Sequence, residues 1–342
     1  LSYNRLISLL LPEGLSDLKS LNLTGNHLTN LHLPEGLRNL TSLNLTGNRL
    51  SRLHLPEWLS NLTSLNLEDN RLTSFTLPES LNKLNALNLD NNSLTSLHLP
   101  EGLKGLTLLS LRGSQLDDFS FLEELSNLSE LSLINNQLRD VSFLETLSNL
   151  TRLELSGNRL SDFSFLEGMS ELASLGIAQN QLTHFNLPEG LSQLTALNLR
   201  GNQLTDTSFL EGLSHLTDLD LGENQLVSLT VPKGLSSLNR LGLSGNQLTD
   251  FSFLESLSHL TDLNLTENHL TDISFLEGLN HLTSLNLGDT HLTRFTLPKG
   301  LSQLNWLNLR NNQLTSVSLE AGMSNLVDLD LSRNRLTSLT LP

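Results

Sequence analysis

Residues 40–50 read LTSLNLTGNRL, a stretch with leucine at its first, fourth, sixth and last places and asparagine at its ninth. An amphipathic helix places apolar residues at i, i+3, i+4 and i+7, and a half-buried strand alternates them with polar ones, so neither explains this spacing. The stretch returns along the chain at a fixed interval, which is the signature of a repeat architecture. The period of this stretch therefore decides the fold.

The leucine that opens the stretch recurs every 22 residues with no insertion or deletion. It stands at 18, 40, 62, 84, 106, 128, 150, 172, 194, 216, 238, 260, 282, 304 and 326. When each repeat is numbered from this leucine, position 4 is always leucine, position 6 is leucine except at Ile177, and position 9 is asparagine except at Ser114 and Thr290. All nine prolines stand at position 17 and all twelve phenylalanines at position 14 or 16. Each of these positions is therefore expected to have a fixed structural role.

The pattern L-x-x-L-x-L-x-x-N-x-L covers the whole chain, and by it the chain resembles the leucine-rich repeat proteins of bacterial type with 22-residue repeats. The second half of each repeat has two forms. One reads LPEGLRNL, as at 33–40, and resembles the proline-bearing repeats of bacterial proteins. The other reads DFSFLEELSNL, as at 118–128, and resembles the repeats of internalin-like adhesins and of phosphatase regulators with the same period.

The spacing predicts a short strand at positions 3 to 7, with Leu43 and Leu45 on the core face and Ser42, Asn44 and Thr46 on the other. Twenty-two residues leave room only for short helical or 3₁₀ turns on the way back. The expected fold class is an α/β solenoid, a curved leucine-rich repeat horseshoe with a parallel concave sheet and such turns on its convex side. We expect a single domain over 1–342, with about 14 complete repeats from 18 to 325, a partial repeat at each end and the terminal caps missing.

The asparagines at position 9 are expected to form a structural ladder, because a carboxamide both donates to and accepts from the turn backbone of its own and the next repeat. They are Asn26, Asn48, Asn70, Asn92, Asn136, Asn158, Asn180, Asn202, Asn224, Asn246, Asn268, Asn312 and Asn334. The shorter Ser114 and Thr290 can make only part of this pattern, so we expect local loosening there.

Aspartate recurs two residues before serine in the DFSF form, as in Asp118 with Ser120. The further members of this column are Asp140, Asp162, Asp250 and Asp272. An aspartate just before a short helical turn caps its free N–H groups, and a structural cap is favoured over a metal ligand at these positions.

The formal net charge is −16, from 20 lysines and arginines against 36 aspartates and glutamates. Such a surface repels phosphate backbones and anionic lipids, so neither nucleic acid nor a membrane is an expected partner. No apolar run approaches the roughly 18 residues of a membrane span. The chain has no cysteine, which excludes disulfides and thiolate metal sites.

No set of residues suggests catalysis, a cofactor or a metal site. The motifs of zinc proteases, serine hydrolases and phosphate-binding loops are absent from the sequence. Histidines recur at the same position of different repeats, as at His259 and His281 and at His269 and His291. Duplication of a tolerated surface residue explains these columns better than metal binding does. We expect a chain that is not an enzyme.

Positions 3, 5, 7, 8 and 10 vary between repeats and cover the concave face, where repeat proteins commonly bind. The candidate ligand-binding residues there are Trp306, Asn308, Arg310, Asp328, Asp330, Asp218, Asp220, Glu223, Arg240, Asp262, Glu267, Arg112, Arg152 and Arg200. Trp306 beside Arg310 is a candidate anchor, because binding hot spots favour these residue types. Contact with a missing C-terminal cap is the alternative for Trp306, and Tyr3 has the same two interpretations at the other end.

Charges on this face are expected to pair across neighbouring strands, Glu130 with Arg152 and Arg240 with Asp218 and Asp262. The remaining acidic surplus predicts a partner with a basic surface, and the scattered arginines are candidate contacts to carboxylates.

The resemblance implies a non-enzymatic protein-interaction module that binds a protein ligand through its concave face, as a bacterial surface or secreted adhesion-type protein. This favours a secreted or cell-surface location over a cytoplasmic one. The alternative is a sensor or targeting arm of a larger intracellular effector or NTPase-type receptor. A minor alternative is a structural, ice-binding or glycan-binding surface. The sequence assigns no oligomeric state.

Overall fold

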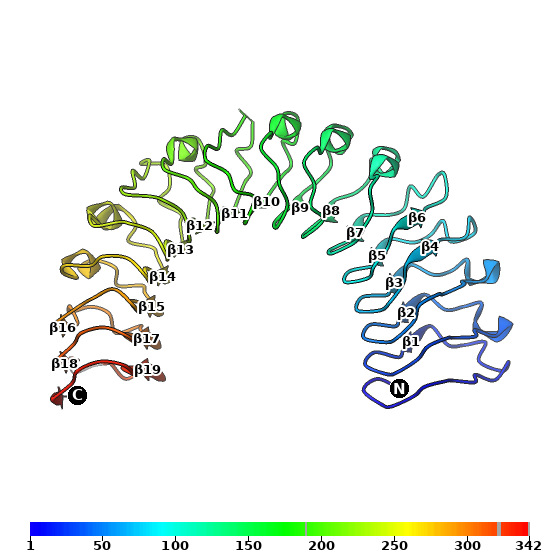
Figure 1. Cartoon of the computed structure of the whole chain (residues 1–342), viewed down its shortest axis with the longest axis horizontal. Helices are drawn as coiled ribbons and strands as arrows, with labels where there is room; N and C mark the ends of the chain where they lie inside the picture. The colour runs from blue at the N-terminus through cyan, green and yellow to red at the C-terminus, as the bar shows by residue number, and fades with distance from the viewer. Residues whose placement is uncertain (189, 320–322, 341–342) are drawn as a thin grey trace. The chain divides into compact units, whose positions relative to one another are not determined.

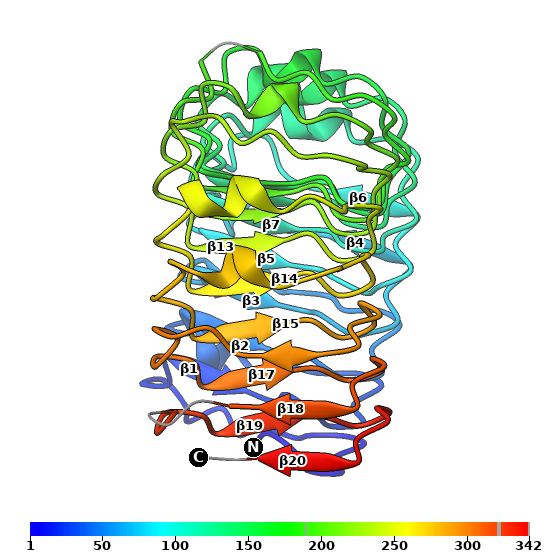
Figure 2. The same ribbon diagram turned by 90° about the vertical axis from the view of Figure 1, so that its left-hand side faces the viewer.

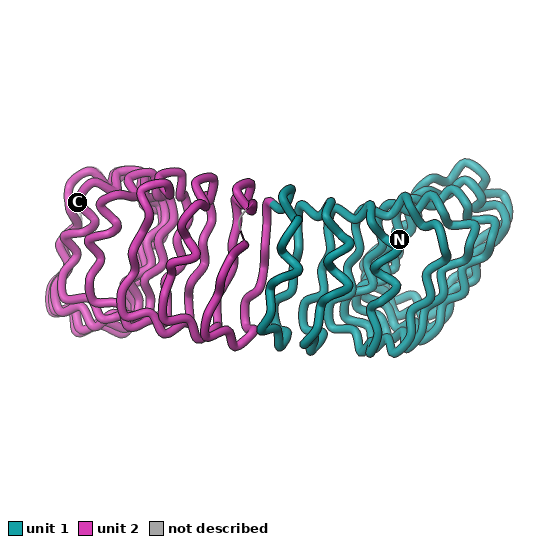
Figure 3. Tube along the Cα trace, turned by 90° about the horizontal axis from the view of Figure 1, so that it is seen from above, with its two compact units in different colours: residues 1–172 teal, residues 173–342 magenta. Residues whose placement is uncertain are grey.

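The computed structural model describes residues 1–188, 190–319 and 323–340. The chain forms two compact units, unit 1 over Leu1–Leu172 and unit 2 over Ala173–Pro342 (Figure 3). Within each unit, one short strand per repeat lines the inner side, and the return segments lie outside (Figure 1). The expectation of a single domain over 1–342 stays a prediction.

The inner strands of each unit are all parallel and follow the order of the sequence. In unit 1 they are β1 (Ser20–Asn22), β2 (Ser42–Asn44), β3 (Ser64–Asn66), β5 (Ala86–Asn88), β7 (Leu108–Ser110), β8 (Glu130–Ser132) and β9 (Arg152–Glu154). In unit 2 they are β10 (Ser174–Gly176), β11 (Ala196–Asn198), β12 (Asp218–Asp220), β13 (Arg240–Gly242), β14 (Asp262–Asn264), β15 (Ser284–Asn286), β17 (Trp306–Asn308) and β19 (Asp328–Asp330). Each residue pairs with the residue 22 places later, as Leu43 does with Leu65. The leucine-rich repeat solenoid is therefore confirmed.

The strands are shorter than expected and cover positions 3 to 5 instead of 3 to 7. Interstrand hydrogen bonding nevertheless continues beyond them, because the N–H of Leu45 donates to the carbonyl of Asn66 and that of Gly47 to the carbonyl of Glu68. At position 8 the backbone enters the left-handed region, with φ of +66° at Gly47, and the chain turns away from the sheet. The turn at position 8 therefore ends each strand.

The core lies between the sheet and the return segments. Leu43 and Leu45 are 1% and 0% exposed, and their counterparts in most other repeats are equally buried. Phenylalanines at positions 14 and 16 pack beneath the outer turns, where the ring of Phe251 lies 5.2 Å from that of Phe275. A column of leucine is thus sufficient to fill the interior of each repeat against the next.

The return segments contain short 3₁₀ helices, as expected. They are η1 (Glu35–Leu37), η2 (Glu57–Leu59), η3 (Ser120–Glu124), η4 (Ser142–Thr146), η5 (Ser164–Leu166), η6 (Ser208–Leu210), η7 (Ser252–Ser256) and η8 (Ser274–Leu276). In the DFSF form the aspartate caps the helix, since the N–H of Ser120 donates to a carboxylate oxygen of Asp118 at 2.8 Å. The same bond joins Ser142 to Asp140, Ser164 to Asp162, Ser208 to Asp206, Ser252 to Asp250 and Ser274 to Asp272.

Some return segments that lack the DFSF sequence contain a second strand, which the sequence did not indicate. In unit 1, β4 (Ser74–Thr76) pairs with β6 (Ser96–His98). In unit 2, β16 (Phe295–Thr296), β18 (Ser316–Ser318) and β20 (Ser338–Thr340) form a three-stranded sheet. Figure 2 shows β18 and β20 running opposite to β17 and β19. These strands occupy positions 13 to 15, where the DFSF form places its capping aspartate and the start of its helix.

The position-9 asparagines lie buried and join neighbouring repeats. The Nδ2 of Asn48 donates to the carbonyls of Leu45, in its own repeat, and of Leu23, in the repeat before, at 2.9 and 3.0 Å. Its Oδ1 accepts from the N–H of Leu28, also in the repeat before, at 3.1 Å. The second partner is therefore the preceding repeat and not the next one, because the position-9 side chain projects back along the solenoid.

The two substitutions in this column make fewer contacts of this kind. The hydroxyl of Ser114 donates to Oδ1 of Asn136 at 2.5 Å. The hydroxyl of Thr290 donates to the carbonyl of Leu287 at 2.8 Å and to Oδ1 of Asn312 at 3.0 Å. A hydroxyl thus replaces part of the carboxamide pattern, and the expected loosening at these two repeats stays a prediction.

Replacing Asn224 with alanine removes donors to the carbonyls of Leu199 and Leu221 and the acceptor for the N–H of Leu204. A buried polar group left without a partner costs about 1–3 kcal/mol, so we expect the free energy of unfolding to fall by about 2–4 kcal/mol. Urea unfolding and amide hydrogen exchange at Leu204 measure the effect. Gln225→Ala, at the exposed neighbouring position, should cost less than about 0.5 kcal/mol. Equal losses in the two variants would contradict this role.

The capping aspartates are expected to make stability depend on pH. Hydrogen bonds from the N–H and hydroxyl of Ser252 hold the pKa of Asp250 below its ordinary value of 3.8. The stabilisation is therefore present above about pH 3.8 and is lost as the pH falls through the lower folded-state pKa. Asp250→Asn keeps an acceptor but removes the charge, so it should lower the thermal unfolding midpoint at neutral pH and not near pH 2. Asp117→Asn is the matched control. A lowered unfolding midpoint of Asp250→Asn that persists unchanged in acid would rule out the charge of Asp250 as its cause.

Candidate functional site

The inner strand face is the exposed side of the sheet, formed by the side chains at positions 3, 5 and 7. Parallel in-register pairing brings equivalent positions of successive repeats side by side. Of the candidate residues, Arg112 and Arg152 lie on this face in unit 1, and the others lie on or beside it in unit 2.

The tryptophan patch consists of Trp306, Asn308, Arg310, Asp328 and Asp330. The register places Trp306 between Ser284 and Asp328, and Asn308 beside Asp330. Trp306 is half-buried and Arg310 is exposed. Hydrogen bonds from the hydroxyl and N–H of Ser332 lower the pKa of Asp330, and the charge of Arg310 contributes in the same direction. The patch thus presents an aromatic face, a guanidinium and ionised carboxylates together.

The acidic stretch consists of Asp218, Asp220, Glu223, Asp262 and Glu267. Arg200 crosses it, because its guanidinium lies 2.7 Å from the carboxylate of Glu223 and 3.0 Å from the hydroxyl of Ser244, two repeats away. Its distance to the Asp220 carboxylate is 4.0 Å. Arg200 is therefore already paired within the chain.

Two glycines leave room for this network. A Cβ at Gly222 would lie 2.9 Å from a guanidinium nitrogen of Arg200, and one at Gly242 would lie 2.7 Å from a carboxylate oxygen of Asp220. Since real Cβ atoms do not approach so closely, either side chain would have to move if the glycine were replaced. The absence of a side chain at Gly222 thus leaves room for the Arg200 guanidinium, and its absence at Gly242 leaves room for the Asp220 carboxylate.

The cross-strand pairing expected in unit 2 is confirmed, since Arg240 lies 3.3 Å from the Asp218 carboxylate and 3.7 Å from that of Asp262. The expected pair in unit 1 is wrong. Arg152 stands beside Glu130 in the register, but its guanidinium lies 3.0 Å from Glu154, two residues along the same strand. Glu154 is less exposed than the other carboxylates in ion pairs, so its charge benefits more from a partner.

Sequence reasoning missed two half-buried carboxylates of unit 1, those of Glu68 and Glu154. Burial raises the pKa of Glu154, and the charge of Arg152 opposes the shift. Burial also raises the pKa of Glu68, with the charges of Asp69 and Asp90 adding to it and that of Arg112 opposing it. The signal that could have found them is a glutamate at position 5, where most repeats carry asparagine or serine, or at position 7, where most carry a small residue.

Position 8 borders the inner strand face and is left-handed in every repeat from Gly25 to Arg333. Glycine, asparagine or aspartate stands there in most repeats, and these residues tolerate that conformation best. Glu223 and Glu267 adopt it at φ of +52° and +57°. Their side chains therefore stand at the edge of the face at some expense in backbone strain.

Neither a metal-binding group nor a membrane-spanning helix is found among the described residues. The rings of His269 and His291 lie 5.2 Å apart, yet no group of three or more histidine, aspartate or glutamate side chains among the described residues could hold a metal ion. Within the same described ranges, no helix has the length and apolar character needed to cross a membrane.

The sequence matches two known repeat families. It matches the family described as "Leucine Rich repeats (2 copies)" over residues 126–168, 192–236 and 236–278. It matches the "BspA type Leucine rich repeat region (6 copies)" over residues 2–107. No curated protein matched the sequence.

Among solved structures, the chain is similar to an internalin (inlF) from Listeria monocytogenes, at 32% identity over 83% of this chain and 84% of that one, with a TM-score of 0.70. A leucine-rich repeat protein of Leptospira interrogans is 31% identical over 99% of this chain and 85% of that one, with a TM-score of 0.66. The ectodomain of the receptor kinase GASSHO1/SCHENGEN3 from Arabidopsis thaliana, in complex with CASPARIAN STRIP INTEGRITY FACTOR 2, is 27% identical. That match covers 94% of this chain and 45% of the other, with a TM-score of 0.61.

Replacing Glu267 with glycine should relieve the strain at position 8. A left-handed residue with a side chain costs about 1–2 kcal/mol, so we expect the free energy of unfolding to rise by about 1 kcal/mol, measured by urea denaturation. Gly245→Ala, at the same position one repeat earlier, should lower it by a similar amount. Its φ is +63° and its new Cβ would lie 3.2 Å from the Cγ of Glu223. Changes of the same sign in both variants would refute the assignment of strain.

Proposed function

This chain belongs to the leucine-rich repeat family, and from that premise we propose that it is a non-enzymatic module that binds a protein ligand through its inner strand face. Proteins of this family serve as interaction scaffolds, and the plant receptor ectodomain to which the chain is similar is named in complex with its factor. The similarity to an internalin supports a bacterial surface or secreted adhesion-type protein as the setting. The chemical class of the ligand is inferred from the side chains of the inner strand face.

The observation that carries the proposal is the tryptophan patch. Binding energy concentrates in a few tryptophan, tyrosine and arginine residues, and elsewhere the inner strand face carries mostly small polar side chains. At Trp306 an aromatic ring has serine on one side and aspartate on the other, so part of its surface remains open to a partner. Arg310 has no ion pair with any described residue and can therefore bind a carboxylate of the ligand.

The acidic stretch supports a partner that is basic where it meets this part of the face. Its five carboxylates share only two guanidiniums, those of Arg200 and Arg240, which leaves three negative charges. Complementary charge accelerates association and selects against acidic competitors. Arg112 and Arg152 are proposed as secondary contacts on the inner strand face of unit 1.

The test uses the chain as immobilised bait for extracts of host cells and of the native organism, with retained proteins identified by mass spectrometry and their affinities then measured singly. The anchor variant is Trp306→Ala with Arg310→Ala. Its control is Trp58→Ala, which removes the other tryptophan from the return segment of a repeat in unit 1. We expect a retained protein to lose at least about tenfold in affinity for the anchor variant, a change of about 1.4 kcal/mol, and none for the control.

The charge variant is Asp218→Lys with Asp262→Lys, and its control is Glu255→Lys with Glu277→Lys in the return segments. A basic ligand should bind the charge variant more weakly, the control normally, and the unmodified chain less tightly as salt is raised. A ligand that binds all four variants equally would remove the inner strand face from the proposal.

A further inference from the structure

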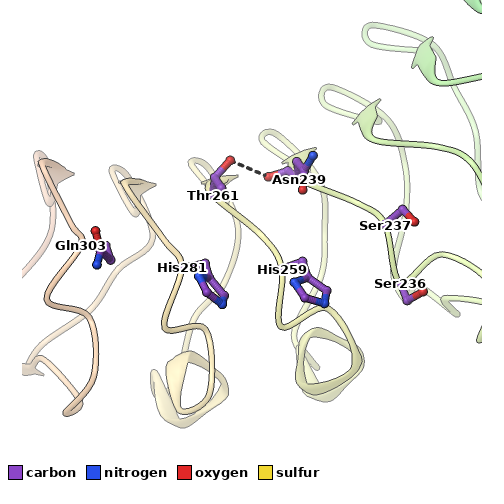
Figure 4. A pocket seen from close by; sticks show the side chains of 7 residues that line it. All are labelled: Ser236, Ser237, Asn239, His259, Thr261, His281 and Gln303. Atoms are coloured by element: carbon purple, nitrogen blue, oxygen red, sulfur yellow. Dashed lines mark hydrogen bonds between the residues drawn. The ribbon is translucent and has the colours of Figure 1, made fainter.

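A shallow hollow of about 490 Å³ lies in unit 2 at the edge where return segments enter the next strand. Its walls come from successive repeats, because His259, His281 and Gln303 all stand at position 22 (Figure 4). Ser236 and Asn239 border it on the preceding repeat. The hollow is separate from the inner strand face, so nothing in this inference depends on the proposed protein ligand.

At position 22, several side chains bond to the backbone carbonyl 23 residues earlier. The Nδ2 of Asn127 donates to the carbonyl of Lys104, 23 residues earlier, at 2.9 Å. Asn149 and Asn325 make the same bond at 2.9 Å, and a ring nitrogen of His215 lies 3.0 Å from the carbonyl of Ser192. These side chains therefore tie one repeat to the one before.

At His259 and His281 this tie is not made. The two rings face each other with centroids 5.9 Å apart and planes inclined by 20°. Among the described residues, neither ring has a hydrogen-bond partner, and the carbonyl of Ser236 receives no side chain from His259. The two exposed imidazoles thus line the hollow without a hydrogen bond to a described residue.

The lining is neutral and hydrogen-bonds in both directions. Imidazole, carboxamide and hydroxyl groups each donate and accept, and no charged side chain lines the hollow. Thr261 is fixed, since its hydroxyl donates to the carbonyl of Asn239 at 3.2 Å and to the carboxylate of Asp262 at 2.7 Å. The side chains of Asn239 and Gln303 have no such bond to a described residue and are available to a ligand.

These features select the class of ligand. Sugar hydroxyls donate and accept as this lining does, and the flat imidazole faces can pack on the apolar side of a pyranose ring. A formal charge of −16 works against anionic ligands, and a volume near the lower end of the range for ligand pockets admits only a short segment. The repeated spacing of His259 and His281 suits a ligand that is itself a chain of similar residues.

We propose that the hollow at His259 and His281 binds a neutral oligosaccharide, laid along successive repeats at the edge of unit 2. The ring nitrogens of both histidines and the side chains of Asn239 and Gln303 hold its hydroxyls. The site adds a carbohydrate-binding activity to a chain whose inner strand face binds protein.

The test measures binding of neutral hexasaccharides of β-linked glucose, β-linked N-acetylglucosamine and α-linked mannose by saturation-transfer NMR and calorimetry. The variant is His259→Ala with His281→Ala. Its control is His269→Ala with His291→Ala, another stacked histidine pair, at position 10 of two successive repeats. Thermal unfolding of each variant verifies that the fold is retained.

We expect at least one hexasaccharide to bind, with its Kd raised by at least about tenfold in the His259 and His281 variant and unchanged in the control. Three outcomes would overturn the proposal. They are no binding of any hexasaccharide at millimolar concentration, equal binding by variant and unmodified chain, and a preference for a heparin-derived anionic hexasaccharide over all three neutral ones.

Discussion

The carboxamide of the position-9 asparagine is the interaction on which the other features of this chain depend. It lies buried and satisfies backbone groups of two successive turns, which the leucine core alone would leave unpaired. It stands directly after the left-handed residue at position 8, where each turn leaves the sheet, and joins that turn to the repeat before, while successive strands keep one register. The side chains of the inner strand face therefore stand in straight columns.

Because the columns are straight, the local chemistry of this face depends on the single residue that stands at each position. Small polar side chains fill most of it, and Arg200 lies across neighbouring repeats where Gly222 leaves space. Trp306 acquires its surroundings in the same way, from whatever the register sets beside it. The edge of the solenoid follows the same logic, since position 22 ties repeats together at Asn127 and His215 and leaves the imidazoles of His259 and His281 without a hydrogen bond to a described residue.

The repeat, its strand face, the asparagine column and the aspartate caps could all be predicted from the sequence, because each depends on residues a fixed, short distance apart. The pairing of Arg152 with Glu154 instead of Glu130 could not, since both carboxylates are within reach and burial decides between them. The reach of Arg200 depends on the absent side chain at Gly222, in the next repeat. The second strands were missed because positions 13 to 15 form either a strand or a capped 3₁₀ turn, according to pairing with the neighbouring repeat.

The backward direction of the asparagine bonds gives the solenoid a polarity. Removing the repeat on the C-terminal side of Leu28 would take away the carboxamide of Asn48. A backbone N–H and a carbonyl in the remaining repeat would then have no hydrogen-bond partner. Removing the repeat on the N-terminal side of Asn48 would instead free the carboxamide itself, which can rotate toward water. The backbone bonds between repeats, such as that from the N–H of Leu23 to the carbonyl of Asn44, are broken in either case. The asparagine bonds therefore make the loss larger at the C-terminal end of a shortened chain than at its N-terminal end.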